Sequence, residues 1–468
     1  MPVFSLPSGY GCGNFGKYAY DFVDFLAAGG FSVWQVLPLC LTDSYNSPYM
    51  SPASFFGNPN FIDLEDLYNQ GLLSESELES QKEQSPYLCE YERLNTERLP
   101  LIIKAAARCK NRSEIERFCD KHPAILQAVT YLALKQANGE KPFYEWQNTE
   151  VDKEYLFALK FMQYHFYTQW QKLKEYANNK GVKICGDLPF YVAPDSADVY
   201  FGSKAFMLDS DKKPKEIAGV PPDYFAADGQ LWGNPVYNWA HLRSDGYGFW
   251  KDRISGAKDL YDIIRLDHFR AFSRFWSVPN GAATAKEGRF KKGGGKGVID
   301  AIKSAAGGCT LVAENLGIID KDVDDLLDYS GFYGMAVFQF GFDGNPQNPH
   351  LPHNYTQKTV AYTGTHDNNT LLGFMWEQPE KVRNSVMEYV GFSGDFNQSY
   401  ESIIRALLLS AAGLVILPVQ DLLGFGGDTR INTPGKADGN WAFRLSPKAF
   451  AGLNADRFYK LNHTYGRI

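Results

Sequence analysis

The sequence has no apolar run that reaches the ~18 residues needed to cross a membrane. Its first ten residues also lack the basic region and apolar core of a signal peptide. Its seven cysteines are scattered and none forms a C-x-x-C pair, which argues against a disulfide framework and against a zinc site. Positive charge is in deficit, with 47 Lys and Arg against 54 Asp and Glu, so nucleic acid is not an expected partner. These absences predict a cytoplasmic protein with no membrane partner that binds something uncharged.

Two further patterns are too weak to predict a ligand. The glycine-rich run Lys291–Gly297 lacks the spacing and the Ser or Thr of a phosphate-binding loop, so a flexible loop is expected there. His350 and His353 are three residues apart, but the sequence offers no obvious third ligand for a metal. We therefore expect neither a metal nor a cofactor.

Aromatic residues are abundant, at 15% of the 468 residues. Their flat apolar faces and polar tips suit sugar binding. A large aromatic core is the alternative, and it would account for most of them.

Periodic patterns divide the chain into helices and short strands. Apolar residues at helical spacing predict a helix over 17–28 and another that ends near residue 177. Residues 64–150, rich in Glu, Lys, Gln and Ser, predict a helical insertion whose charges are solvated. Residues 191–250, rich in Pro, Gly, Tyr and Trp, predict a loop-rich insertion that covers a substrate.

Eight short strand signals alternate with helices, near residues 4, 35, 184, 264, 311, 337, 361 and 416. Alternation of this kind indicates parallel βα units. We predict an α/β fold: one (β/α)8 TIM barrel over residues 1–468, with the helical insertion after strand 2 and the loop-rich insertion after strand 3.

Four of these strand signals end in an acidic residue: Asp187, Asp267, Glu314 and Asp367. A β-branched run that stops at a carboxylate is typical of a barrel strand that delivers a side chain to the catalytic face. Each such residue alone could instead cap a helix or pair with Arg. Together they predict carboxylate chemistry at the mouth of the barrel.

Two carboxyl groups about 5–5.5 Å apart can cleave a glycosidic bond with retention. One attacks the anomeric carbon, and the other protonates the leaving oxygen and later deprotonates the acceptor. Arg265 lies two residues before Asp267, on the same side of a strand, where it favours the ionised carboxylate. His268 and His366 each adjoin a carboxylate and can donate to sugar hydroxyls.

Several segments resemble the amylomaltases, or 4-alpha-glucanotransferases, of the alpha-amylase superfamily. The resemblance runs in family order from about residue 5 to 445 and includes the stretches beginning at Ser47, Gly186, Gly219, Gly229, Arg265, Ala313, Thr365 and Pro434. It is most specific in Gly-Gln-Leu-Trp-Gly-Asn-Pro, residues 229–235. One departure is Asn315, which stands where the family usually has Asp.

The resemblance implies roles for particular residues. Asp267 would be the nucleophile, Glu314 the acid/base and Asp367 the transition-state stabiliser. Sugar contacts at the cleavage point are implied for Tyr49, Asp187, Arg265 and His366, and acceptor contacts for Tyr224, Gln230 and Trp232.

The expected activity is transfer of α-1,4-glucan segments between donor and acceptor sugars. A hydrolase with the same site is the nearest alternative. A glucan-binding scaffold without catalysis is another, but mere binding would not need three carboxylates and Arg265.

Overall fold

Seven parallel strands form the centre of the fold in the computed structural model, which describes residues 1–222, 227–317 and 319–468. They lie in the order β1-β2-β5-β8-β9-β10-β11. Their bounds are β1 (Val33–Gln35), β2 (Lys183–Leu188), β5 (Ile263–Leu266), β8 (Thr310–Ala313), β9 (Tyr333–Val337), β10 (Thr359–Tyr362) and β11 (Leu414–Ile416). Because neighbours in the sheet follow each other along the chain, with helices between them, the fold is a TIM barrel of the (β/α)8 type.

The predicted strand near residue 4 is wrong. Val3–Ser5 form a 3-10 helix, in which the backbone N–H of Leu6 donates to the carbonyl of Val3. The run is apolar and buried, but the prolines at positions 2 and 7 leave it too short to form a ladder. Strands β1 and β11 are therefore the edges of the sheet. The Tyr362 hydroxyl of β10 donates to Gln35 Oε1 of β1 at 2.9 Å and links the two sides of the barrel.

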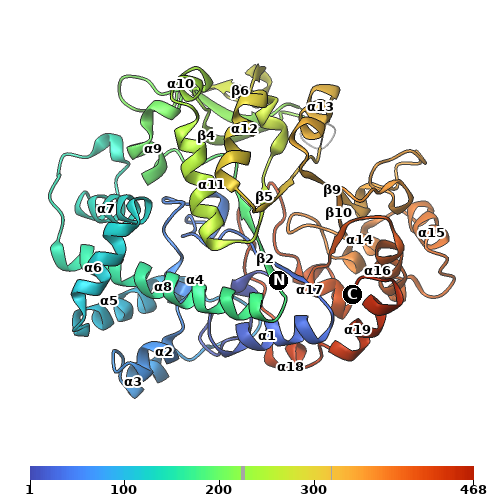
Figure 1. Ribbon diagram of the computed structural model, residues 1–468, viewed down its shortest axis with the longest axis horizontal. Helices are drawn as coiled ribbons and strands as arrows, with labels where there is room; N and C mark the ends of the chain where they lie inside the picture. Colours follow the sequence, from blue (N-terminus) through green and yellow to red (C-terminus); the bar gives the residue numbers. More distant parts are fainter. Residues whose placement is uncertain (223–226, 318) are drawn as a thin grey trace.

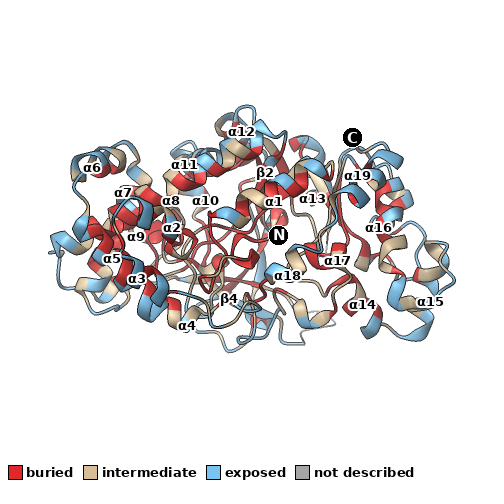
Figure 2. Cartoon of the chain, turned by 90° about the horizontal axis from the view of Figure 1, so that it is seen from below, coloured by how far each residue is buried: buried red, intermediate tan, exposed pale blue. Residues whose placement is uncertain are grey.

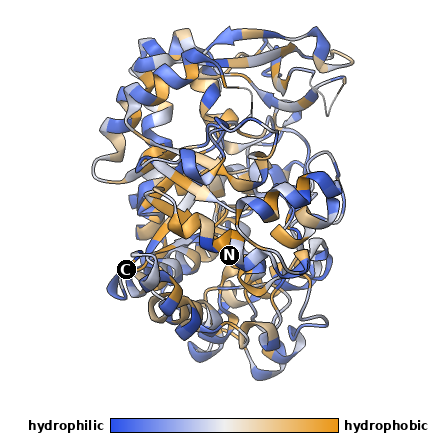
Figure 3. Cartoon of the chain, turned by 90° about the vertical axis from the view of Figure 1, so that its right-hand side faces the viewer, coloured by the Kyte–Doolittle hydropathy of each residue, from blue (hydrophilic) through white to orange (hydrophobic). Residues whose placement is uncertain are grey.

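Helices surround the strands, and their exposed faces point outward (Figure 2). Helix α8 (Lys153–Asn179) is the predicted helix that ends near residue 177, and Asp152 caps its first turn. Its apolar residues at helical spacing are all buried: Leu159, Met162, Phe166, Trp170, Leu173 and Ala177. The barrel helices are α1 (Lys17–Ala28), α8, α11 (Gly248–Leu260), α12 (Gly295–Ala306), α13 (Lys321–Ser330), α14 (Leu371–Glu377), α15 (Glu380–Tyr389), α16 (Tyr400–Leu409), α17 (Val419–Leu423), α18 (Pro447–Phe450) and α19 (Ala455–Thr464). Apolar residues accordingly gather toward the middle of the molecule in Figure 3.

Residues 64–150 contain six helices between β1 and α8. They are α2 (Leu64–Asn69), α3 (Glu75–Ser80), α4 (Tyr91–Arg93), α5 (Leu99–Arg108), α6 (Arg112–Lys121) and α7 (Pro123–Ala137). Figure 1 shows α5, α6 and α7 at the left of the molecule, opposite α15 and α16. No described helix is both long enough and apolar enough to cross a membrane.

Residues 191–250 are less irregular than their composition predicts. They contain α9 (Ala197–Phe201), β3 (Glu216–Val220), β4 (Gln230–Pro235) and α10 (Trp239–Ser244). Strands β3 and β4 pair antiparallel and join β6 (Arg274–Pro279) and β7 (Arg289–Lys292) in a second sheet, ordered β4-β3-β6-β7. The prediction of a loop-rich insertion missed these strands.

Candidate functional site

Strand register brings the predicted carboxylates together at one end of the barrel. Asp187 of β2 lies opposite Arg265 of β5, and Leu266 lies opposite Ala313 of β8. The residues that follow this last pair, Asp267 and Glu314, therefore end adjacent strands, which are about 4.8 Å apart in a sheet.

Arg265 is the centre of the site. It is 4% exposed, and its Nη1 donates to both carboxylate oxygens of Asp187 at 2.7 Å and to Asp267 Oδ1 at 3.0 Å. The Tyr49 hydroxyl also donates to Asp187 Oδ2, at 2.7 Å. Asp267 Oδ2 has no hydrogen-bond donor among the described residues, so this oxygen is available to react.

Glu314 is held by the main chain. Its Oε2 accepts from the backbone N–H of His268 at 2.7 Å, and its Oε1 accepts from that of Leu316 at 2.9 Å. Burial and the nearby Asp267 charge raise the pKa of Glu314 to about 8, against the opposing effects of Arg265 and the two N–H groups. The carboxyl group therefore carries its proton at neutral pH, as a general acid must.

The surroundings of Asp367 lower its pKa, whereas those of Glu314 raise its pKa. His366 Nε2 lies 3.2 Å from Asp367 Oδ2, and the Asn432 amide donates to Oδ1 at 2.6 Å. Burial alone would raise the pKa of Asp367, but His366 and Asn432 outweigh it and lower that pKa to about 2. The same contact raises the pKa of His366 despite its burial. Asp367 is therefore a carboxylate at neutral pH.

Two aromatic rings, those of Tyr49 and Trp441, pack against His366 of this pair. Tyr49 stacks on His366 with centroids 5.1 Å apart, and Trp441 lies 5.7 Å from His366 and 5.8 Å from Tyr49. Trp441 has the left-handed φ of 63°, rare for a residue with a side chain, and its backbone N–H donates to the Ile431 carbonyl at 2.7 Å. A backbone held in this conformation keeps the indole against the two rings that contact Asp187 and Asp367.

A second aromatic group lies around His268, whose backbone N–H donates to Glu314. Trp232 of β4 lies 5.1 Å from the His268 ring, edge to face, and donates from Nε1 to Gln230 Oε1 at 3.1 Å. Tyr191 lies 6.1 Å from both Trp232 and His268. Burial and Arg270 lower the pKa of His268 to about 3, so its imidazole is neutral. Tyr224, the remaining residue predicted to bind sugar, lies outside the described residues.

Other residues singled out in the sequence have structural partners. His350 Nδ1 accepts from the Val337 N–H, and His353 contacts the Tyr389 hydroxyl and the Pro346 carbonyl. Within residues 1–222, 227–317 and 319–468, no group of three or more His, Cys, Asp and Glu is placed to hold a metal. Asn315 Oδ1 accepts from the Met335 N–H at 2.7 Å and ties the end of β8 to β9.

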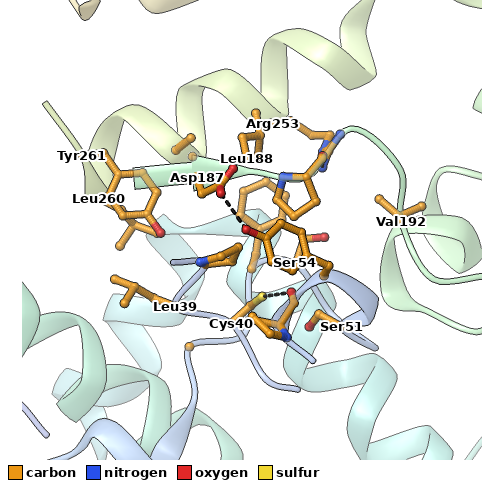
Figure 4. Close-up of a pocket in the computed structure, with 18 of the residues that line it drawn as sticks. Leu39, Cys40, Ser51, Ser54, Asp187, Leu188, Val192, Arg253, Leu260 and Tyr261 are labelled. Atoms are coloured by element: carbon orange, nitrogen blue, oxygen red, sulfur yellow. Dashed lines mark hydrogen bonds between the residues drawn. The ribbon is translucent and has the colours of Figure 1, made fainter. Parts of the chain in front are cut away.

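A cavity of about 50 Å³ lies beside Asp187, between the segment after β1 and helices α8 and α11 (Figure 4). Cys40, Arg253 and Tyr261 are among its lining residues. Pockets for small organic ligands typically measure roughly 300–1,000 Å³, so this space is too small for a sugar.

Sequence reasoning missed three residues of this site: Arg430, Asn432 and Trp441. Arg430 Nη2 donates to the Asp367 carbonyl at 2.5 Å, and the Asn432 N–H donates to that of His366 at 3.0 Å. Their segment follows the last strand and has no periodic pattern. The one available signal was the motif from Pro434 to Trp441, which carried no assigned role.

The sequence matches known proteins along nearly its whole length. A profile described as 4-alpha-glucanotransferase matches residues 1–449. The chain is 39% identical to the chloroplastic/amyloplastic 4-alpha-glucanotransferase of Arabidopsis thaliana, covering 98% of this chain and 83% of that protein. It is 36% identical to the 4-alpha-glucanotransferase of Clostridium butyricum, covering 100% of each.

Solved structures agree with the sequence matches. The amylomaltase of Streptococcus agalactiae in complex with acarbose superimposes with a TM-score of 0.95 at 33% identity, over 100% of this chain and 98% of that one. The amylomaltase of Corynebacterium glutamicum gives a TM-score of 0.82 at 18% identity, over 99% and 74%, which supports the fold alone.

Proposed function

This chain belongs to the 4-alpha-glucanotransferase family and is an enzyme of that class; from this premise we propose that it transfers α-1,4-glucan segments by a retaining double displacement. The observation that carries the proposal is the pairing of Asp267 with a Glu314 whose pKa is raised to about 8, at the ends of adjacent strands. One group is placed to attack while the other holds a proton.

In the first step, Asp267 Oδ2 attacks the anomeric carbon of the donor, and Glu314 gives its proton to the departing glycosidic oxygen. The donor fragment becomes an ester of Asp267, and the remainder leaves with a free hydroxyl group. Arg265 orients the attacking carboxylate through Oδ1, which leaves Oδ2 free.

In the second step, Glu314, now ionised, removes the proton from an acceptor hydroxyl, whose oxygen attacks the ester. A new glycosidic bond forms, and Asp267 returns to its carboxylate form. Asp367, ionised through His366 and Asn432, stabilises the positive charge that develops on the sugar ring in both transition states.

The remaining residues bind the sugars on either side of the reacting bond. Tyr49, Asp187, Arg265 and His366 surround the ring whose bond is cleaved. Trp232, Gln230 and His268 face the acceptor and limit access of water to the ester. Tyr224 belongs to this acceptor group by resemblance.

Donors and acceptors of starch or glycogen type fit this site. We also infer a cytoplasmic location, although the Arabidopsis thaliana relative is described as chloroplastic or amyloplastic.

Incubation with maltotriose tests the proposal. A ladder of longer maltooligosaccharides together with glucose is expected, because the ester is passed to a second sugar. Glucose and maltose alone would mean that water intercepts the ester and that the enzyme is a hydrolase. Absence of turnover by the folded protein would contradict the proposal altogether.

A further inference from the structure

Trp376 differs from every other tryptophan of the chain. All nine lie in the described residues, and Trp376 alone is classed as exposed, with 50% of its surface in solvent. It lies near the end of α14, the helix that follows the Asp367 segment. Half-exposure of so large an apolar ring contributes less to stability than full burial would, and it leaves an aromatic surface available to a ligand.

The exposed ring is fixed in orientation. Its Nε1 donates to Asn397 Oδ1 at 2.8 Å, and Asp395 in turn accepts from the Asn397 amide at 2.8 Å. The buried Gly426 lies against the ring: a Cβ added there would come within 2.5 Å of Trp376 Cη2. One part of the indole is thus seated on the protein, and the exposed part is held ready for a ligand.

The groups around the ring are polar and mainly acidic. Glu377, Asp395, Asn397 and Asp428 are all exposed near it. Carboxylates accept hydrogen bonds from hydroxyl groups and repel anions. An aromatic face bordered by such acceptors suits a polyhydroxylated ring with an apolar face, namely a sugar.

The segment 424–430 connects this ring to the catalytic site. Gly426 lies against Trp376, a Cβ added at Gly427 would lie 2.9 Å from Asn369 Oδ1, and Arg430 donates to the Asp367 carbonyl at 2.5 Å. The four steps along the chain from Gly426 to Arg430 span at most about 14 Å. An oligosaccharide bound at Asp367 and long enough to cross this distance can therefore reach Trp376.

We propose that Trp376 is a stacking platform for a distal glucose unit of a long α-glucan whose other end occupies the catalytic site. This inference rests on the proposed function. It assigns to this surface a preference for long over short glucans. The occupant is the substrate chain itself, because the platform is continuous with the catalytic site and lacks the positive charge that an anionic partner would need.

Kinetics on donors of different length test the platform. Trp376→Ala should leave the KM for maltotriose within two-fold of the wild-type value and raise the KM for long amylose by roughly 3- to 10-fold. The matched control is Tyr459→Ala on α19, which removes an aromatic ring of similar exposure, 49%, and should change neither value. Unchanged KM values for both donors in Trp376→Ala, or equal increases for both, would overturn the proposal.

A second measurement separates this inference from the proposed function. In native gels that contain amylose, the wild type should be retarded more than Trp376→Ala, and Trp376→Phe should fall between them because it keeps a ring. Equal retardation of all three folded proteins would refute the platform even if transfer is normal. Failure of the wild type to turn over maltotriose would count against the proposed function. The gel would still show whether Trp376 contributes to amylose binding.

Discussion

The two sides of the active site are built by different means. On the first side, which comprises Asp267, His268, Glu314 and Leu316, adjacent parallel strands and main-chain N–H groups place the carboxylates. On the second side, which comprises His366, Asp367, Arg430 and Asn432, side chains from a distant part of the sequence surround one carboxylate. On the first side, burial has the largest effect on the carboxyl pKa and raises that of Glu314 to about 8. On the second side, the combined effects of His366 and Asn432 outweigh burial, and the pKa of Asp367 falls to about 2.

This contrast shows that the type of residue does not determine the role of a carboxyl group. Asp267 and Glu314 directly follow β5 and β8, and Asp367 lies five residues beyond β10; burial and partner groups together set the protonation states of Glu314 and Asp367. The predictions below test each side in turn.

The largest effect is expected on the first side, from Asp267→Asn. The amide cannot form the ester, so transfer should fall by about four orders of magnitude or more, while circular dichroism and thermal unfolding stay close to wild type. A folded variant that retains a tenth of the activity would show that another group is the nucleophile.

Glu314→Gln and Asp367→Asn compare the two sides directly. Glu314→Gln should lose roughly 10²- to 10⁴-fold with maltotriose, because no proton reaches the leaving oxygen, yet regain ester formation with a glucosyl donor that has fluoride as its leaving group. Asp367→Asn should not be rescued in this way. Equal behaviour of both variants with the fluoride donor would mean that the roles are wrongly divided.

The pH profile sharpens this comparison. Because Glu314 must hold its proton in the first step, and its pKa is raised to about 8, wild-type kcat/KM should fall as the pH rises through about 8. With the fluoride donor and the Glu314→Gln enzyme, this basic limb should be absent. A basic limb that persists there belongs to a different group.

Substitutions of Trp441 test whether catalysis depends on how this residue positions Tyr49 and His366 on the second side. Trp441→Leu should lower kcat/KM by about 10- to 100-fold, because Tyr49 and His366 lose the ring that packs against them, and displacements near 1 Å are costly in catalysis. Trp441→Phe keeps a ring and should recover most of the activity. If both variants lose activity only in proportion to lost thermal stability, Trp441 is a structural residue.

A smaller effect is expected from Trp232, which borders the first side. Trp232→Ala should raise the share of hydrolysis over transfer by a few-fold, since the acceptor loses a ring to stack on and water gains access to the ester. Trp232→Phe, which keeps an aromatic ring at this position, serves as the control and should leave the product ratio close to that of the wild type. An unchanged product ratio with reduced stability would limit Trp232 to packing.

The smallest effect is expected from Asn315→Asp. The Asn315 side-chain oxygen accepts from the Met335 N–H, and a carboxylate oxygen can accept the same bond. Activity with maltotriose should stay within about two-fold of wild type. A tenfold change would show that the charge at this position reaches Glu314.

Much of the first side could be predicted from sequence, because it depends on local signals. Four β-branched runs ended in carboxylates, and the parallel register then placed Asp267 beside Glu314. The apolar stripe of α8 was likewise visible, since burial imposes a 3.6-residue period.

Local sequence signals could not predict the second side of the site. They also did not predict the 3-10 helix at Val3–Ser5 or the β3–β4 pair. Arg430 and Asn432 meet Asp367 across more than 60 residues of sequence, and no periodicity marks them. Residues 3–6 had the composition of a strand, but strand formation depends on a partner that composition does not reveal. The β3–β4 pair was hidden because glycine and proline obscured its alternation.

The way in which hydrogen bonds orient Glu314 has an evolutionary consequence. Its two donors are the main-chain N–H groups of His268 and Leu316, which every residue except proline supplies. The side chain at 316 can therefore vary without removing a donor from the proton-transfer group. At 268 the left-handed φ of 48° restricts the residues that fit, and a single change at Asn432 removes a donor from Asp367. The acid/base group is the more robust to point mutation, and new sugar specificities can evolve around it while the proton chemistry is preserved.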